Sequence, residues 1–174
     1  MYRNQRIDSS YNFIQEYTTH VVPIATTADG NCLFHAISNS IYGNESMTYK
    51  IKIATVFIML EYEQYFTQVL EQNGNPIDFQ TLVKQNANLG EWGTDYSMLG
   101  LSILLNRPIY SLGRFANNCL NSDATSSGHA PLAIALTKNH FVGLLAQTFE
   151  ATVSEPKMLA TRFFKFSPGP IDLY

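Results

Sequence analysis

Two hydrophobic patterns follow one another along this chain, and their order is the feature that most constrains its fold. Apolar residues recur at helical spacing up to about residue 105, and short apolar runs typical of buried strands follow. Helices are expected over residues 11–17, 32–42, 48–70, 78–83 and 94–105, and strands over 21–27, 107–112, 131–136 and 140–145. Helices followed by a cluster of strands favour an α+β fold, built as a small α/β sandwich with a short central sheet flanked by helices.

The chain of 174 residues is long enough for one domain with one main core. We expect residues 1–174 to form this single domain, with the informative motifs within 21–150. The tail 151–174 is aromatic and Pro-rich and is expected to pack on or beside the sheet. Residues 116–130 are rich in Asn, Ser and Gly and are interpreted as a surface loop.

Composition excludes several classes of function. The net charge of −3 and the lack of a Lys or Arg cluster argue against a nucleic-acid partner. The apolar run 53–60 is too short to span a bilayer, and the N-terminus lacks the apolar stretch of a secretory signal. Two cysteines without a Cys/His cluster suggest neither a disulfide framework nor a metal site. We therefore expect an intracellular, cytoplasmic monomer without membrane association, compatible with a host-directed effector or with part of a larger polypeptide.

The segment Ala28-Asp-Gly-Asn-Cys32 carries the first chemical signal. An Asp-Gly-Asn turn leads into a predicted helix that opens at Cys32, and the N-terminus of a helix lowers the pKa of a thiol. The backbone N–H groups of Gly30, Asn31 and Cys32 would converge as an oxyanion hole for acyl transfer. The alternative is an inert, buried thiol.

A nucleophilic cysteine needs a base, and the chain has four histidines. His20 and His129 lie in polar contexts. His35 lies on the first turn after Cys32 and is interpreted as a partly buried polar residue. His140 opens an apolar strand directly after a turn, where the imidazole is held rigidly yet stays accessible. His140 is therefore the favoured base.

The stretch "DGNCLFHAIS" at 29–38 resembles the nucleophile motif of the ovarian-tumour (OTU) family of cysteine proteases. The segments "EWGTDYSMLGLSILLNRPIYSL" at 91–112 and "PLAIALTKNHFVGLL" at 131–145 resemble two further family blocks in the right order. The resemblance implies a papain-type cysteine protease fold and a thiol-dependent deubiquitinase. Such an enzyme cleaves (iso)peptide bonds after the C-terminal glycine of ubiquitin or a ubiquitin-like protein. Cys32 would be the nucleophile and His140 the base, with no metal and no cofactor.

The residue that orients the histidine is the main departure from the family pattern. The family commonly has Asn or Asp two residues after the histidine, where this chain has Val142. Asp29 is the first candidate for the third member, and its alternative role is structural, as a cap of the Cys32 helix or a support of the turn. Asn139 is the alternative. Asp8, Thr26 and Thr27 are more remote possibilities, and a dyad without a third member is another.

Trp92 and Phe141 are candidate substrate-binding residues. Trp92 would line the channel for the ubiquitin tail, or it would anchor the helix that follows it. The replacement of the expected Asn or Asp by Val142 keeps open a catalytically weak or inactive, OTU-like ubiquitin-binding module. A thiol hydrolase for a different acyl substrate is the remaining alternative.

Overall fold

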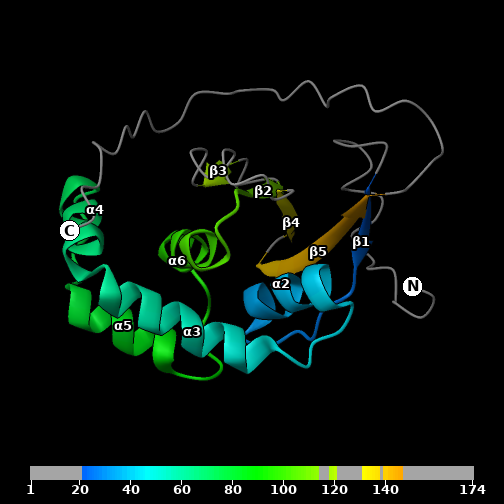
Figure 1. The fold of residues 1–174 in the computed structure, drawn as a ribbon, viewed down its shortest axis with the longest axis horizontal. Coiled ribbons are helices and arrows are strands. Elements are labelled where there is room, and N and C mark those ends of the chain that lie inside the picture. Colours follow the sequence, from blue (N-terminus) through cyan, green and yellow to red (C-terminus); the bar gives the residue numbers. More distant parts are fainter. Residues whose placement is uncertain (1–20, 114–117, 121–130, 138, 147–174) are drawn as a thin grey trace.

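The computed structural model describes residues 21–113, 118–120, 131–137 and 139–146. Its strands are β1 (Val21–Ile24), β2 (Ile109–Gly113), β3 (Asn118–Leu120), β4 (Leu132–Thr137) and β5 (His140–Ala146). Its helices are α2 (Cys32–Tyr42), α3 (Thr48–Glu61), α4 (Glu63–Gln72), α5 (Phe79–Ala87) and α6 (Asp95–Leu105). Figure 1 shows these elements in one α+β arrangement, which confirms the predicted fold class.

The five strands form one mixed sheet in the order β1-β5-β4-β2-β3. β4 and β5 form the predicted antiparallel hairpin, whose register pairs Thr137 with His140. His140 therefore stands at the first position of its strand, beside the turn. β1 pairs with the other side of β5 and is an edge strand of this sheet. Pro23 has no N–H to donate, and an edge strand tolerates it because one of its sides has no partner strand.

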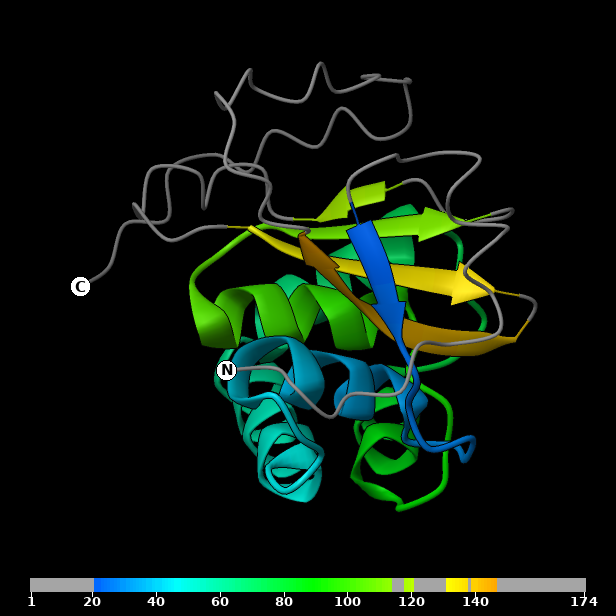
Figure 2. The ribbon, with the colours of Figure 1, turned by 90° about the vertical axis from the view of Figure 1, so that its right-hand side faces the viewer.

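The main core lies between one face of the sheet and the helices α2 and α6. Leu33, Phe34 and Ile37 of α2 pack with Phe141 of β5 and with Met98 and Leu101 of α6. Figure 2 shows the helices gathered to one side of the sheet. Because successive strand residues face opposite sides, Val142 points away from these helices and packs with Ala135 and Leu144.

A second core joins α3, α4 and α5, with Met59, Phe66 and Leu82 fully buried. The sequence predicts one continuous helix over 48–70, but the chain breaks at Tyr62 into α3 and α4. Tyr62 has φ −106° and ψ 33°, outside the helical region. Tyr62 packs against this second core, and no Gly or Pro marks the position, so the sequence carries no local signal for the break.

Local caps mark the ends of three helices. Gly43 ends α2 in the left-handed conformation, with φ 73°. Asp78 accepts a hydrogen bond of 2.6 Å from the backbone N–H of Thr81, and α5 then continues to Ala87, beyond the expected end at residue 83. Thr94 caps α6 in a reciprocal arrangement with Ser97.

The prediction of a loop over 116–130 is wrong in part. Residues Asn118–Leu120 form the short strand β3, which pairs with β2. Other predictions concern residues outside the part of the chain that the structure describes, namely the helix 11–17, the tail 151–174, His20 and His129. Within the part of the chain that the structure describes, no helix has the length and apolar character needed to cross a bilayer.

Candidate active site

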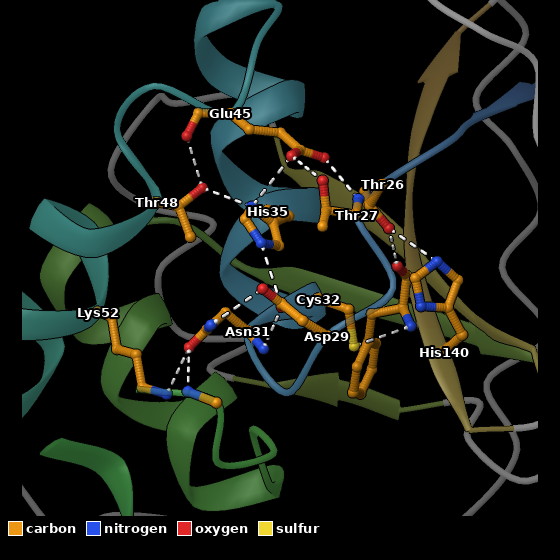
Figure 3. Close-up of polar contacts among 12 residues, drawn as sticks. Thr26, Thr27, Asp29, Asn31, Cys32, His35, Glu45, Thr48, Lys52 and His140 are labelled. Atoms are coloured by element: carbon orange, nitrogen blue, oxygen red, sulfur yellow. Dashed lines mark hydrogen bonds and ion pairs between the residues drawn. The ribbon is translucent and has the colours of Figure 1, made fainter. Parts of the chain in front are cut away.

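Cys32 is the first residue of α2 and is only 2% exposed. Its Sγ accepts a hydrogen bond from the backbone N–H of Phe141 at 3.5 Å. Phe141 follows His140 directly, so the thiol lies against the start of β5. In Figure 3 the Cys32 side chain points toward the strand that carries His140. The fold thus brings the two predicted catalytic residues into one region.

Burial raises the pKa of the Cys32 thiol. The backbone N–H groups of Phe141 and Leu33 act in the opposite direction, and the nearby carboxylate of Asp29 adds to the rise. The helix N-terminus alone was expected to favour the thiolate. Instead, desolvation outweighs the backbone N–H groups, so the resting thiol is neutral. A base must therefore take its proton during attack.

The imidazole of His140 is half-buried, and its Nε2 lies 3.0 Å from the hydroxyl of Thr26. The same hydroxyl donates to the backbone carbonyl of Phe141 at 2.6 Å. Figure 3 shows Thr26 in the loop after β1, beside the ring. Sequence reasoning named Thr26 only among the remote candidates.

The turn before Cys32 is held by its own hydrogen bonds. The Asn31 N–H donates to Oδ1 of Asp29 at 2.7 Å, and the Cys32 N–H donates to the Asp29 carbonyl at 3.2 Å. Two of the three N–H groups predicted for an oxyanion hole are therefore engaged within the turn. Of these three N–H groups, that of Gly30 has no hydrogen-bond partner among the described residues. An oxyanion at Asn31 would have to displace the Asp29 carboxylate.

Two backbone segments approach so closely at position 30 that only glycine fits there. A Cβ on Gly30 would lie 1.5 Å from the carbonyl oxygen of Gly90 and 2.9 Å from the nitrogen of Glu91. No larger residue fits there without moving one of the two segments. The Asp-Gly-Asn turn is therefore packed directly against the loop that precedes Trp92.

A buried lysine joins the same two segments. Lys52 of α3 is 1% exposed, and its Nζ donates to Oδ1 of Asn31 at 2.8 Å and to the Glu91 carbonyl at 3.0 Å. The Gly90 N–H also donates to Oδ1 of Asn31, at 3.1 Å. Burial lowers the pKa of Lys52, while Glu91 and Asp29 act in the opposite direction. The sequence gives no signal for Lys52, because a lysine on a helix usually faces solvent.

The carboxylate of Asp29 faces His35 rather than His140. Its Oδ1 lies 3.2 Å from Nε2 of His35, close enough for an ion pair although the ring N–H is not aligned with the oxygen. Burial by itself would raise the pKa of Asp29, but hydrogen bonds from Asn31 and the contact with His35 hold the pKa below its usual value. Asp29 therefore stabilises the turn.

His35 is buried at the centre of a polar cluster behind the turn. Its Nδ1 lies 2.9 Å from the Thr48 hydroxyl and 3.3 Å from the carboxylate of Glu45. The Thr48 hydroxyl donates to the Glu45 carbonyl, so the His35 Nδ1 must be the donor toward Thr48. Figure 3 shows Glu45 between His35 and Thr27. This agrees with the interpretation of His35 as a buried polar residue.

The remaining candidates lie in different surroundings. Trp92 is 54% exposed, so its ring is not a buried anchor for α6. The Phe141 side chain is buried in the main core, and only its backbone reaches the site. Asn139 is an exposed turn residue, and no hydrogen bond joins it to His140 among the residues described. Those residues also contain no group of three His, Cys, Asp or Glu side chains arranged to hold a metal ion.

Solved structures identify the class of fold. The OTU domain of OTUD1 superimposes with a TM-score of 0.61 at 17% identity, covering 78% of this chain and 91% of that one. The Hazara virus OTU, in a structure bound to ubiquitin, gives a TM-score of 0.56 at 18% identity, covering 76% and 85%. The fold is therefore that of OTU domains.

Sequence comparison leads to the same family. The family model for the OTU domain of vertnin matches residues 23–88. OTU domain-containing protein 1 of Mus musculus is 24% identical over 139 residues, which cover 80% of this chain. Together with the fold, these matches show that the chain is similar to OTU domains. The matched regions span only 26% of the mouse protein and 22% of its Homo sapiens counterpart.

Proposed function

We propose that this protein is a thiol-dependent deubiquitinase that cleaves (iso)peptide bonds after the C-terminal glycine of ubiquitin or a ubiquitin-like protein. The observation that carries the proposal is the contact of the Cys32 sulfur with the backbone of Phe141, next to His140. Similarity to OTU proteases, including one bound to ubiquitin, supports a deubiquitinase-like function. Ubiquitin would be the partner of an intracellular, monomeric, single-domain enzyme that needs no cofactor.

The proposed chemistry begins with a neutral thiol. Sγ of Cys32 attacks the carbonyl carbon of the glycine while its proton passes to His140. The tetrahedral intermediate collapses, and His140 returns the proton to the departing amine. Water then attacks the thioester, loses a proton to His140, and the protonated imidazole returns it to the sulfur. Each step conserves protons, and the cycle ends with the neutral thiol that the pKa of Cys32 favours.

The test is covalent capture by ubiquitin that carries an electrophile at its C-terminus. The reduced protein should form one adduct at Cys32, which peptide mass spectrometry locates. Cys32→Ala should abolish the adduct, and Cys119→Ala should leave it unchanged. A folded, reduced protein that forms no adduct with ubiquitin or ubiquitin-like probes would contradict the proposal.

A catalytically weak or inactive ubiquitin-binding module is the second candidate. It is favoured by Val142, which cannot hydrogen-bond an imidazole, and by the engagement of the Asn31 N–H with Asp29. Diubiquitin digestion and ubiquitin binding separate the two functions. An enzyme cleaves diubiquitin and loses turnover, but not binding, in Cys32→Ala. A binding module shows binding without turnover in both proteins.

A further inference from the structure

The loop that follows β1 carries a hydroxyl group that the proposed chemistry has not yet used. We propose that Thr26 is the positioning residue for His140, holding the imidazole as the Nε2–H tautomer so that Nδ1 is the basic nitrogen. The inference rests on the proposed function for its catalytic consequence. Its structural part concerns only the tautomer of His140 and stands without that function.

The assignment follows from the protons available at one oxygen atom. The Thr26 hydroxyl has a single proton, and a backbone carbonyl can only accept, so this proton is donated to the Phe141 carbonyl at 2.6 Å. Toward His140, at 3.0 Å, the same oxygen can only accept. Nε2 must therefore carry the ring proton. The neutral ring then has its lone pair on Nδ1, which Figure 3 shows on the side of the ring that faces Cys32.

The other described side chains considered for this role lie elsewhere, and Asp8 lies outside the described residues. Val142 is fully buried in an apolar cluster and offers no hydrogen-bonding group. The Asp29 carboxylate accepts a hydrogen bond from Asn31 and contacts His35. Asn139 is exposed on the turn before β5. Thr26 is the residue of the described chain whose side chain contacts a ring nitrogen of His140.

The backbone around Thr26 is held before any substrate arrives. Ile24, two residues earlier, pairs with Gly143 of β5. Asn39 donates to the carbonyl of Ala25 at 3.4 Å. The carboxylate of Glu45 accepts from both the N–H and the hydroxyl of Thr27, at 2.8 and 2.6 Å. Because both neighbours of Thr26 are anchored, its hydroxyl keeps a fixed place relative to the ring.

This arrangement has a consequence for proton transfer. When Nδ1 receives the Cys32 proton, the ring becomes an imidazolium whose Nε2–H already points at the Thr26 oxygen. A hydrogen bond to a charged donor is stronger than one between neutral groups, so the contact strengthens as the charge develops. The bond that Thr26 makes to the Phe141 carbonyl further polarises its oxygen. A neutral hydroxyl stabilises the cation less than a carboxylate does, so Thr26 acts mainly by orientation.

The test compares Thr26→Val, which keeps the shape and removes the hydroxyl, with Thr26→Ser, which keeps the hydroxyl. With ubiquitin bearing a C-terminal fluorogenic amide, Thr26→Val should lower kcat by about 10- to 100-fold with little change in KM. The kcat of Thr26→Ser should stay within about threefold of that of the unchanged protein, because serine keeps the hydrogen-bonding hydroxyl. Imidazole ¹⁵N spectra of His140 should show the Nε2–H tautomer in the unchanged protein and in Thr26→Ser. Thr26→Val should shift the ring toward the Nδ1–H form.

Thermal unfolding measurements check that each variant is folded. Thr26→Ala replaces Thr26→Val if the latter does not fold. The inference is overturned if the folded variant keeps the His140 spectrum of the unchanged protein. It is equally overturned if the unchanged protein turns over and the folded variant keeps its kcat within about twofold. If the unchanged protein has no turnover, the proposed enzymatic function fails, and the ¹⁵N spectra alone decide the role of Thr26.

Discussion

The sulfur of Cys32 lies 3.5 Å from the backbone nitrogen of Phe141, although 109 positions separate the two residues in the sequence. This contact joins the N-terminus of α2 to the first residues of β5. The thiol is buried and accepts a hydrogen bond from this peptide N–H. The reactivity of the thiol therefore depends on how these two elements pack.

Alkylation of Cys32 should reveal its raised pKa. Because burial disfavours the thiolate, reaction of the free protein with iodoacetamide should be slow at neutral pH. The rate should rise with pH and reach its midpoint above the ordinary value for a thiol. The rate is measured by peptide mass spectrometry in a Cys119→Ser background, where Cys32 is the one cysteine left. A midpoint below the ordinary thiol value contradicts the desolvation argument.

Gly30→Ala should destabilise the protein through steric overlap. The added methyl would lie 1.5 Å from the Gly90 carbonyl oxygen, so the turn or the facing loop must shift. We expect a loss of about 2–3 kcal/mol in the free energy of unfolding, measured in urea. Gly74→Ala is the control, because Gly74 has φ +60° and open space around it. Its backbone strain should cost about 1 kcal/mol, and an equal loss in both variants would argue against the steric mechanism.

Lys52→Met should weaken the link between the Asn31 turn and the loop at Glu91. The substitution keeps the apolar stem but leaves the Glu91 carbonyl without its lysine donor and Asn31 with only the Gly90 N–H. We expect a loss of about 1–3 kcal/mol in the free energy of unfolding. Lys50→Met on the same helix changes an exposed lysine and should cost less than about 0.5 kcal/mol. The prediction fails if the two urea midpoints shift equally.

Glu45→Ala should loosen the segment that carries Thr26. The Glu45 carboxylate is the acceptor for the Thr27 N–H, which lies on an exposed part of the backbone. Without it, hydrogen exchange of the Thr27 amide should accelerate by at least about tenfold. Glu61→Ala, at the exposed end of α3, serves as the control. Unchanged protection of Thr27 in Glu45→Ala would show that other contacts hold the segment.

The locally determined parts of the fold could be predicted from the sequence. Gly43 ends α2 because a left-handed residue is needed there, and Thr94 starts α6 because its hydroxyl caps the free N–H groups. The hairpin of β4 and β5 follows from two apolar runs around a short turn. The break at Tyr62 could not be predicted, because no Gly or Pro marks the position and its side chain packs against a core that forms only in the folded chain.

By itself, the sequence determined that Cys32 opens a helix after a glycine-containing turn and that His140 opens a strand. Both follow from preferences that act over a few residues. Only the tertiary structure decided the partners across the site, such as Thr26 at 3.0 Å from a ring that lies 114 positions away, and Lys52 against Asn31. It also decided that Asp29 faces His35. These pairings depend on which elements pack side by side and which faces they turn inward, and no spacing along the chain encodes that relationship directly.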